Sequence, residues 1–418
     1  MKVSVYASGK RRFVCLINEH EIPVQPLANA FIYDEFLNAS LSTKKRVAYE
    51  LKVVIGYFAN NHMDLTQRIS SAQFLTSSEI SKFYGQMMLT RNSFEDNKNT
   101  SVISIAASKK LRNAMASSIY NNCKVCPETR TGRIRTLRKY LSYLYDHFHG
   151  DKSVSEEVIH SFHSMQNKLK AKENYASSKR LARTVELVES VIPNDIYQKF
   201  MHIIEPNSSE NPFQSSKLRN FLILSVLAQT GLRRSEVCKI KISDCDFSYD
   251  YNKIKVYSSP DDKSDPRLYR PDKKNGRAHI SGIEVNLMKL IKFYILHQRS
   301  KFSLSRSHDF IFITEKNSYS TAGLPITREM VNYILSKVSN AINFKISPHL
   351  LRHKWNERLS ERAEAIGLER EYTEDLRRNA MGWQPNSQMG RIYNDKHEQL
   401  IAIQIMNEHQ VKIDGSEE

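Results

Sequence analysis

The sequence predicts a mostly α-helical protein with a small antiparallel sheet, an α+β fold, divided into more than one domain. The chain has 418 residues, which is enough for two or three domains with substantial cores. Apolar residues recur with helical spacing through most of the chain, whereas only a few short segments alternate as strands do. A helical pattern from residue 155 becomes lysine-rich near residues 168–180 and runs into a linker between domains.

Residues 1–27 alternate weakly between apolar and polar side chains. Val3 and Val5 precede a break at Gly9, and Ile17 follows it. This pattern predicts a short strand or hairpin. Such a segment could be a small arm that contacts DNA or an edge ribbon, and the residues alone do not separate the two.

The pattern turns helical from residue 28 to about residue 175. Ser42 is a candidate cap of a helix that runs to about Asn60, and Thr76 with Glu79 forms a candidate capping box for another helix. We expect further helices, in chain order, at residues 103–115, at residues 129–147 and from residue 155 onward.

The helix expected at residues 129–147 is amphipathic and basic. Its apolar side carries Ile134, Leu137, Leu141, Leu144 and Tyr145. Its other side carries Arg130, Arg133, Arg135, Arg138 and Lys139. A solvated helix face and a contact with a DNA backbone account for this pattern equally well.

The second half of the chain, from about residue 185, mixes helices with short strands. An apolar helix at residues 218–229 ends at Gly231, where glycine suits a C-cap. Strands are expected at residues 254–257, 267–270 and 277–280, the last two joined by a tight turn at residues 272–276, and a short buried strand or extended segment at residues 310–313. The remaining helices are expected at residues 185–191, 193–204, 285–296, 326–338 and 398–409, before an acidic tail at residues 411–418.

Composition restricts the class of protein and its partners. Hydrophobic content is 40% and charged content is 26%, as in globular proteins. The net charge of +17 favours polyanionic partners, nucleic acid first. No apolar run resembles a signal peptide or a membrane span. Cys123 and Cys126 form a Cys-x-x-Cys pair without a second pair, so we expect no zinc site.

Four short motifs carry residues suited to chemistry on a phosphodiester. They are Thr230-Gly231-Leu232-Arg233-Arg234-Ser235-Glu236, then Pro348-His349-Leu350-Leu351-Arg352-His353, then Met381-Gly382-Trp383, and last Arg391-Ile392-Tyr393. Each motif alone is weak, because short patterns occur by chance. Their order and spacing together are the stronger observation.

In this order and spacing the chain resembles the tyrosine recombinase (phage integrase) family. The family's Thr-Gly-x-Arg-x-x-Glu box is matched from Thr230 to Glu236, and its His-x-x-Arg-His box from His349 to His353. A glycine followed by histidine or tryptophan, and then a tyrosine, is matched by Gly382-Trp383 and Tyr393. Two features depart from the usual pattern. Tyr393 lies one residue farther from Trp383 than is usual, and histidine is more common than tryptophan at that position.

The resemblance implies a role for each residue of the site. Arg233 and Arg352 would hold the phosphate, and Tyr393 would be the nucleophile that forms a 3′-phosphotyrosyl bond. Lys274, with Lys273 as its rival, would protonate the departing 5′ oxygen. His349 would assist proton transfer or hold the phosphate, and Trp383 would donate its indole N–H to a phosphate oxygen. Glu236 and His353 would support these groups. No metal, ATP or other cofactor is implied.

The resemblance also implies domains and partners. Residues 28–175 would form a helical core-binding (SAM-like) domain, residues 176–184 a linker and residues 185–410 the catalytic domain, together forming a C-shaped clamp on double-stranded DNA. Lys139, Lys179 and Arg180, with Arg130 and Arg133, are the candidate DNA-binding residues. A homotetramer on synapsed DNA, a monomer or dimer when free, and accessory DNA-bending or directionality factors are expected. The location would be cytoplasmic, at the nucleoid of a prokaryote.

The expected function is site-specific recombination, with integration or excision of a mobile element as its use. Two alternatives remain. A type IB topoisomerase shares this chemistry on one duplex, and the family's fold could also serve a DNA-binding protein whose active site has decayed. The complete set of site residues argues against decay. The N-terminal helical region and the C-terminal helix favour recombination over topoisomerase activity.

Overall fold

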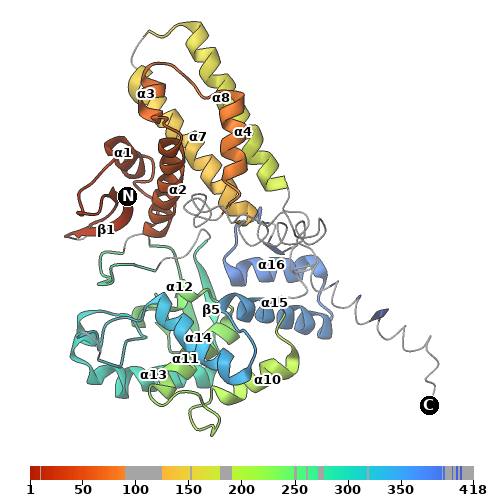
Figure 1. The fold of residues 1–418 in the computed structure, drawn as a ribbon. Coiled ribbons are helices and arrows are strands. Elements are labelled where there is room, and N and C mark those ends of the chain that lie inside the picture. Colours follow the sequence, from red (N-terminus) through yellow and green to blue (C-terminus); the bar gives the residue numbers. More distant parts are fainter. Residues whose placement is uncertain are drawn as a thin grey trace, which may run out of the picture. The chain divides into compact units, whose positions relative to one another are not determined.

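The computed structural model describes residues 1–9, 11–89, 125–150, 153–178, 191–248, 252–259, 262–271, 277–317, 320–387, 389–390, 398, 402 and 405–406 (Figure 1). The chain forms two compact units, Met1–Ala182 and Arg183–Glu418. Helices dominate both units, and the described part of each contains a small antiparallel sheet, so the α+β class predicted from sequence is confirmed. The helices expected at residues 103–115 and 185–190 lie outside the described residues.

The first unit begins with the hairpin that the sequence predicts. Strand β1 (Lys2–Ser8) pairs with β2 (Arg11–Ile17) in antiparallel register. Leu16 is fully buried, and its backbone N–H donates to the side-chain oxygen of Asn29 at 2.7 Å. One face of the ribbon therefore packs in the core of this unit, and a hydrogen bond joins the ribbon to the helix that begins at Pro26.

Six helices complete the described part of the first unit. They are α1 (Pro26–Asp34), α2 (Leu41–Asn60), α3 (Leu65–Ser70), α4 (Ser77–Gln86), α7 (Pro127–His149) and α8 (Glu156–Ser178). The capping box of Thr76 and Glu79 is present at the start of α4, as predicted. The cap of α2 is Ser40 rather than Ser42. Helix α8 runs to Ser178, so the linker expected from residue 176 starts too early.

Helix α7 corrects the prediction of a basic DNA-facing side. Arg130 and Arg133 are 7% and 6% exposed. Helix α4 ends at Gln86, and the backbone carbonyls at its end have no hydrogen-bond donor within the helix. Arg133 Nη1 donates hydrogen bonds to the carbonyls of Met87 at 3.1 Å and Leu89 at 2.9 Å. The guanidinium carbon of Arg130 lies 4.9 Å from the ring centre of Tyr84. Both arginines pack inside the unit, and neither presents an open face to DNA.

The remaining basic residues of α7 lie nearer the surface. Glu173 of α8 accepts from Arg135 Nε at 2.6 Å and from Arg138 Nε at 3.1 Å. Lys139 is exposed, and its ammonium lies 5.5 Å from the ring centre of Phe36. Lys139 is therefore the member of the predicted set on α7 that remains a candidate for binding DNA. Lys179 and Arg180 lie outside the described residues.

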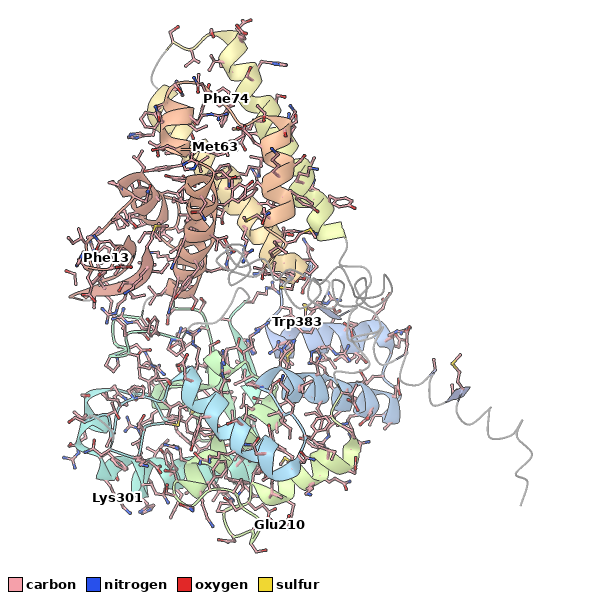
Figure 2. All side chains as sticks on the ribbon, in the orientation of Figure 1. Phe13, Met63, Phe74, Glu210, Lys301 and Trp383 are labelled. Atoms are coloured by element: carbon pink, nitrogen blue, oxygen red, sulfur yellow. The ribbon has the colours of Figure 1, made fainter. Side chains whose placement is uncertain are left out.

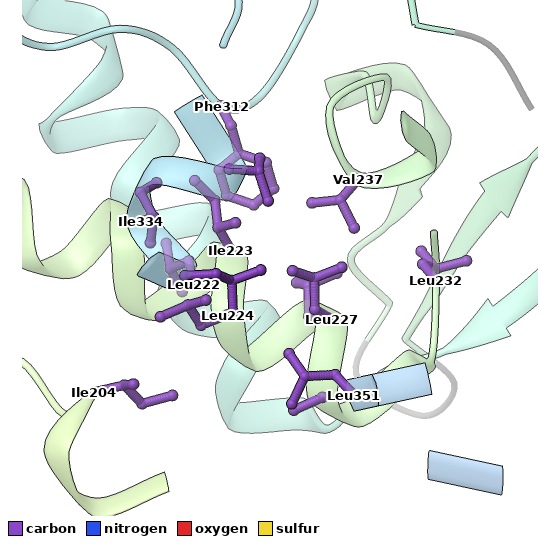
Figure 3. Close-up of a cluster of buried hydrophobic side chains, with 14 of the residues drawn as sticks. Ile204, Leu222, Ile223, Leu224, Leu227, Leu232, Val237, Phe312, Ile334 and Leu351 are labelled. Atoms are coloured by element: carbon purple, nitrogen blue, oxygen red, sulfur yellow. The ribbon is translucent and has the colours of Figure 1, made fainter. Parts of the chain in front are cut away.

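The second unit is built around one helix that is buried on all sides. Helix α11 (Lys217–Thr230) carries Leu222, Ile223, Leu224 and Leu227 with no measurable exposure. A helix that is apolar all round belongs in the centre of a domain. Figure 3 shows these side chains meeting Phe312, Ile334 and Leu351 from other segments.

The other elements of the second unit surround α11. The helices are α10 (Asn194–Ile203), α12 (Arg234–Val237), α13 (Val285–His297), α14 (Arg328–Ile342), α15 (Pro348–Ala365) and α16 (Arg370–Met381), with short 3-10 turns η3 (Ile242–Asp244), η4 (Arg299–Lys301) and η5 (Ser303–Ser307). Strands β3 (Cys245–Asp246), β4 (Lys253–Val256) and β5 (His279–Gly282) form an antiparallel sheet in that order. Among the described residues, no helix is long and apolar enough to cross a bilayer.

The strand predicted at residues 267–270 is wrong. Strand β4 pairs with β3 and β5, and residues 267–270 form no strand. Arg267 is instead buried in a loop, where it pairs with Asp265 at 2.7 Å and donates to the carbonyl of Cys238 at 2.9 Å. Its guanidinium carbon also lies 4.7 Å from the ring centre of Phe310. These tertiary contacts outweigh the weak strand pattern.

Candidate active site

The first motif is placed by the end of the central helix α11. Gly231 adopts φ +61°, and its N–H donates to the carbonyl of Leu227 at 3.1 Å, which closes the helix. Thr230 is buried and donates to the carbonyl of Val226. This left-handed turn sends the chain directly into Arg233, the N-cap residue of the short helix α12.

A buried carboxylate holds Arg233. The backbone N–H of Arg233 donates to Glu236 Oε2 at 2.7 Å, and its Nη1 donates to Glu236 Oε1 at 3.1 Å. The Glu236 side chain is 1% exposed, whereas that of Arg233 is 30% exposed. Because a guanidinium has five N–H donors, Arg233 can bind a further anion while Glu236 fixes its orientation.

The second motif lies in the first turns of helix α15. Ser347 caps it by accepting from the N–H of Leu350 at 3.2 Å, and Pro348 occupies the first turn, where proline is tolerated. Arg352 is 3% exposed, and its Nη1 donates to the carbonyl of Gly231 at 2.8 Å. This bond joins two motifs that lie 121 residues apart, and it places Arg352 at the turn that carries Arg233.

The third motif lies at the end of α16. Gly382 adopts φ +59°, and the N–H of Trp383 donates to the carbonyl of Arg378 at 3.0 Å. The Trp383 ring is 5% exposed, and its centre lies 5.8 Å from the guanidinium carbon of Arg352. Figure 2 labels Trp383 in this unit. The three motifs therefore meet around Gly231 and Arg352, although each comes from a different helix end.

The two histidines of the second motif lie on one side of α15. Their ring centres are 4.4 Å apart at an angle of 74°. His349 is exposed and His353 is 9% exposed. An exposed imidazole next to a guanidinium site can hold a phosphate or move a proton, whereas the less accessible one is better placed to support it.

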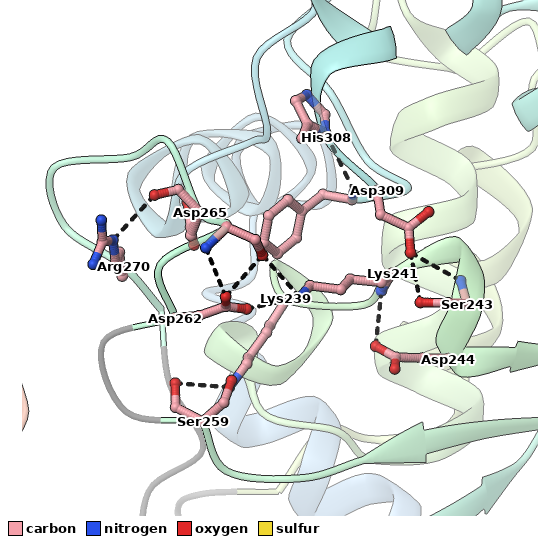
Figure 4. Close-up of polar contacts among 12 residues, drawn as sticks. Lys239, Lys241, Ser243, Asp244, Ser259, Asp262, Asp265, Arg270, His308 and Asp309 are labelled. Carbon is pink, nitrogen blue, oxygen red and sulfur yellow. Dashed lines mark hydrogen bonds and ion pairs between the residues drawn. The ribbon is translucent and has the colours of Figure 1, made fainter. Parts of the chain in front are cut away.

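Two predicted catalytic residues, Lys274 and Tyr393, lie outside the described residues, as does Lys273. Both lysines lie in the connection from β4 to β5. The described part of this connection that precedes them is held by hydrogen bonds and an ion pair. Lys241 Nζ bonds Asp262 at 2.8 Å, and Arg270 Nε donates to the carbonyl of Asp265 at 3.0 Å (Figure 4). Beyond the lysines, the N–H of Arg277 donates to the carbonyl of Gly382 at 3.0 Å.

Sequence reasoning missed Trp355. Its indole N–H donates to the carbonyl of Gln229 at 2.8 Å, and its ring packs against Met381 and Trp383. A β-carbon added at Gly231 would lie 3.0 Å from its Cγ atom. Two tryptophans occur in the whole sequence, and both fall in the motif-bearing region, a signal that could have identified Trp355.

Electrostatically, the site gathers two guanidinium groups, an indole and an imidazole. Such a set suits an anion with several oxygens, because guanidinium groups bind phosphate oxygens through paired, charge-assisted hydrogen bonds. Among the described residues, no group of three or more His, Cys, Asp or Glu side chains is arranged to hold a metal ion.

A family model matches most of the second unit. The model of the phage integrase family matches residues 190–399. The tyrosine recombinase XerC of Pediococcus pentosaceus is 30% identical over 225 residues, which cover 52% of this chain and 65% of that protein. XerC of Staphylococcus aureus is 28% identical over 234 residues, which cover 54% of this chain and 67% of that protein.

Solved recombinase structures are similar over more of the chain. The XerH site-specific recombinase bound to its palindromic difH substrate has a TM-score of 0.44 at 17% identity, covering 79% of this chain and 84% of that one. The Tn1549 transposon integrase in complex with circular intermediate DNA has a TM-score of 0.38 at 13% identity, covering 75% of this chain and 94% of that one.

Proposed function

Because the chain belongs to the phage integrase family, we propose that it is a site-specific recombinase that cuts and rejoins double-stranded DNA through a covalent bond to Tyr393. One observation above all supports this. Arg352 donates to the carbonyl of Gly231, two residues before Arg233, so both arginines of the motifs converge at one turn. A buried carboxylate and an indole ring complete the arrangement.

The arginines stabilise the charge that develops on the phosphate. In-line attack on a phosphodiester concentrates negative charge on the equatorial oxygens of the transition state. Arg233 and Arg352 bind these oxygens, and Glu236 keeps Arg233 oriented, so little reorganisation is needed during the reaction. Trp383 donates its indole N–H to a non-bridging oxygen but cannot carry a proton.

The bond exchange itself conserves the phosphodiester energy. The phenolate oxygen of Tyr393 attacks phosphorus, the bond to the 5′ oxygen breaks, and Lys274 or Lys273 gives that oxygen its proton. A tyrosine hydroxyl has an ordinary pKa of about 10, so nearby cations are needed to favour the phenolate. Attack by a 5′ hydroxyl on the phosphotyrosine reverses the step and rejoins DNA without ATP. Integration or excision of a mobile element is the use we propose for it.

A homotetramer on two synapsed duplexes is part of the proposal. The final segment contributes an exposed apolar surface: Ile405 and Met406 are 59% and 63% exposed. Such residues are suited to packing on a neighbouring protomer. Truncation after Glu398 should therefore weaken assembly on DNA. A truncated protein that forms the same complexes would contradict this part of the proposal.

Covalent trapping tests the proposed chemistry. The protein is incubated with nicked duplexes from the two ends of its own genetic locus, in the presence of EDTA, and adducts that survive SDS are measured. The wild type should form an adduct, and Tyr393→Phe should bind the same DNA without forming one. An adduct in Tyr393→Phe would refute the role of this tyrosine. Specific binding without any adduct would favour the DNA-binding alternative, and relaxation of supercoiled plasmid without a target site would favour a topoisomerase.

A further inference from the structure

Two residues shortly before the proposed nucleophile are packed against α16. Met389 contacts the apolar cluster of Trp355, Met381 and Trp383. Gly390 is buried, and a β-carbon added there would collide with the carboxylate of Glu374. Because Tyr393 follows Gly390 by three residues, chain geometry keeps its Cα within about 11 Å of Gly390. The place where Gly390 sits therefore restricts where Tyr393 can act.

A buried arginine fixes the Glu374 carboxylate. Arg377, one turn farther along α16, has no measurable side-chain exposure and forms an ion pair with Glu374, which is 13% exposed. The same guanidinium donates to the hydroxyl of Ser360 on α15. A long acidic side chain at this position would otherwise sample several rotamers, so the buried pair converts it into a fixed wall beside Gly390.

The same hydrogen bonds continue to the phosphate-binding arginine. Ser360 Oγ donates to the carbonyl of Asn356 at 3.4 Å, and Asn356 Nδ2 donates to the carbonyl of Arg352 at 2.8 Å. The wall beside Gly390 and the backbone of Arg352 are thus ends of one polar chain across α15 and α16. Hydrogen bonds thus connect the residues that pack against Gly390 with Arg352, the proposed phosphate ligand.

We propose that Glu374 and Arg377 are positioning residues for the tyrosine nucleophile, and that residue 390 is glycine because only glycine fits against the Glu374 carboxylate. This inference rests on the proposed recombinase function. With Met389 and Gly390 seated against α16, the short connection that leads to Tyr393 begins from a fixed point. When a side chain at residue 390 pushes the segment away, the phosphate site stays intact while the nucleophile is misplaced.

The test separates nucleophile placement from DNA binding. Gly390→Ala should lower the single-turnover rate of adduct formation at saturating nicked DNA by about 10- to 100-fold, since a displacement near 1 Å can cost that much. Its DNA dissociation constant should match that of the wild type, and its urea unfolding curve should show that the second unit remains folded without urea. Gly282→Ala is the matched control, because no atom lies within 4 Å of the added β-carbon, and it should keep the wild-type rate.

A second variant tests the contact itself. Glu374→Asp retains the charge for Arg377 but withdraws the carboxylate by one methylene. It should restore at least part of the adduct rate in the Gly390→Ala background, and a double-mutant cycle measures this coupling. A wild-type rate in Gly390→Ala, or the same loss with and without Glu374→Asp, would overturn the inference. If the wild type forms no adduct through Tyr393, the proposed function fails instead.

Discussion

Replacing Gly231 with alanine should destabilise the catalytic unit and disturb Arg352 together. Gly231 adopts φ +61°, and a left-handed conformation costs an L-residue about 1–2 kcal/mol. The added β-carbon would lie 2.8 Å from Met381 Cε and 3.0 Å from Trp355 Cγ. Overpacking of this kind costs about 1–3 kcal/mol. We therefore expect the free energy of unfolding to fall by about 2–5 kcal/mol. The upper end is favoured because Trp355 is held by its bond to the carbonyl of Gln229.

Tryptophan fluorescence is a selective assay for this effect. The chain contains two tryptophans, Trp355 and Trp383, and both lie in the second unit close to Gly231. Urea unfolding followed by their emission therefore reports on the unit that holds the mutation. Gly367→Ala is the matched control, because Gly367 adopts φ +69° but no atom lies within 4 Å of its added β-carbon.

The difference between the two variants isolates the packing contribution. Gly367→Ala should lose only the conformational part, about 1–2 kcal/mol. Gly231→Ala should lose more, and its adduct formation should fall because Arg352 donates to the Gly231 carbonyl. Equal losses of stability in the two variants would refute the argument that Met381 and Trp355 close tightly on this turn.

Two further predictions concern the loop before the proposed catalytic lysine. Burial alone would raise the pKa of Asp262, but hydrogen bonds from Lys241 and Ser264 and the Lys241 charge lower it from 3.8 to about 2. A depressed carboxyl pKa stabilises the fold above about pH 4, and this stability is lost as the pH falls toward 2. Asp262→Asn should therefore cost about 1 kcal/mol at pH 7, because solvent screening weakens this partly exposed pair, and little near pH 2, measured by urea unfolding; an equal cost at both pH values would exclude the ionic contribution. Asp265→Asn, which leaves Arg267 buried without its carboxylate, should cost about 3–5 kcal/mol, whereas the more exposed control Asp246→Asn should cost far less, because solvent screens its pair with Lys253. Similar losses in these two variants would refute the buried pair.

Local signals in the sequence predicted the parts of the site that local chemistry determines. A glycine after an apolar helix predicted the left-handed turn at Gly231, and the structure confirms it. The motif order predicted that residues far apart in sequence would meet, and Arg352 does contact the turn before Arg233. The motifs could not predict the hydrogen bond that joins them, from Arg352 to the carbonyl of Gly231. Every residue has a backbone carbonyl, so the sequence does not indicate which one accepts a given bond.

Three errors in the prediction come from buried charges. Arg130, Arg133 and Arg267 lie in patterns that indicate exposed or alternating positions, yet all three are buried. A hydrophobicity pattern treats every arginine as polar and therefore as exposed. Each of these residues is buried because a carbonyl, a carboxylate or an aromatic ring accepts its guanidinium, and such partners are set by tertiary structure.

The same reasoning explains why the sequence predicted Trp383 as a site residue but did not indicate a role for Glu374. Trp383 stands beside a glycine in a motif, so the sequence marks it. Glu374 occurs in a charged stretch of α16 that looks like an ordinary solvated helix face. Its importance depends on Arg377 being fully buried beneath it and on Gly390 returning against it from a later segment. In the proposed mechanism, one helix with a charged sequence thus carries both the indole that contacts the phosphate and the carboxylate that positions the nucleophile segment.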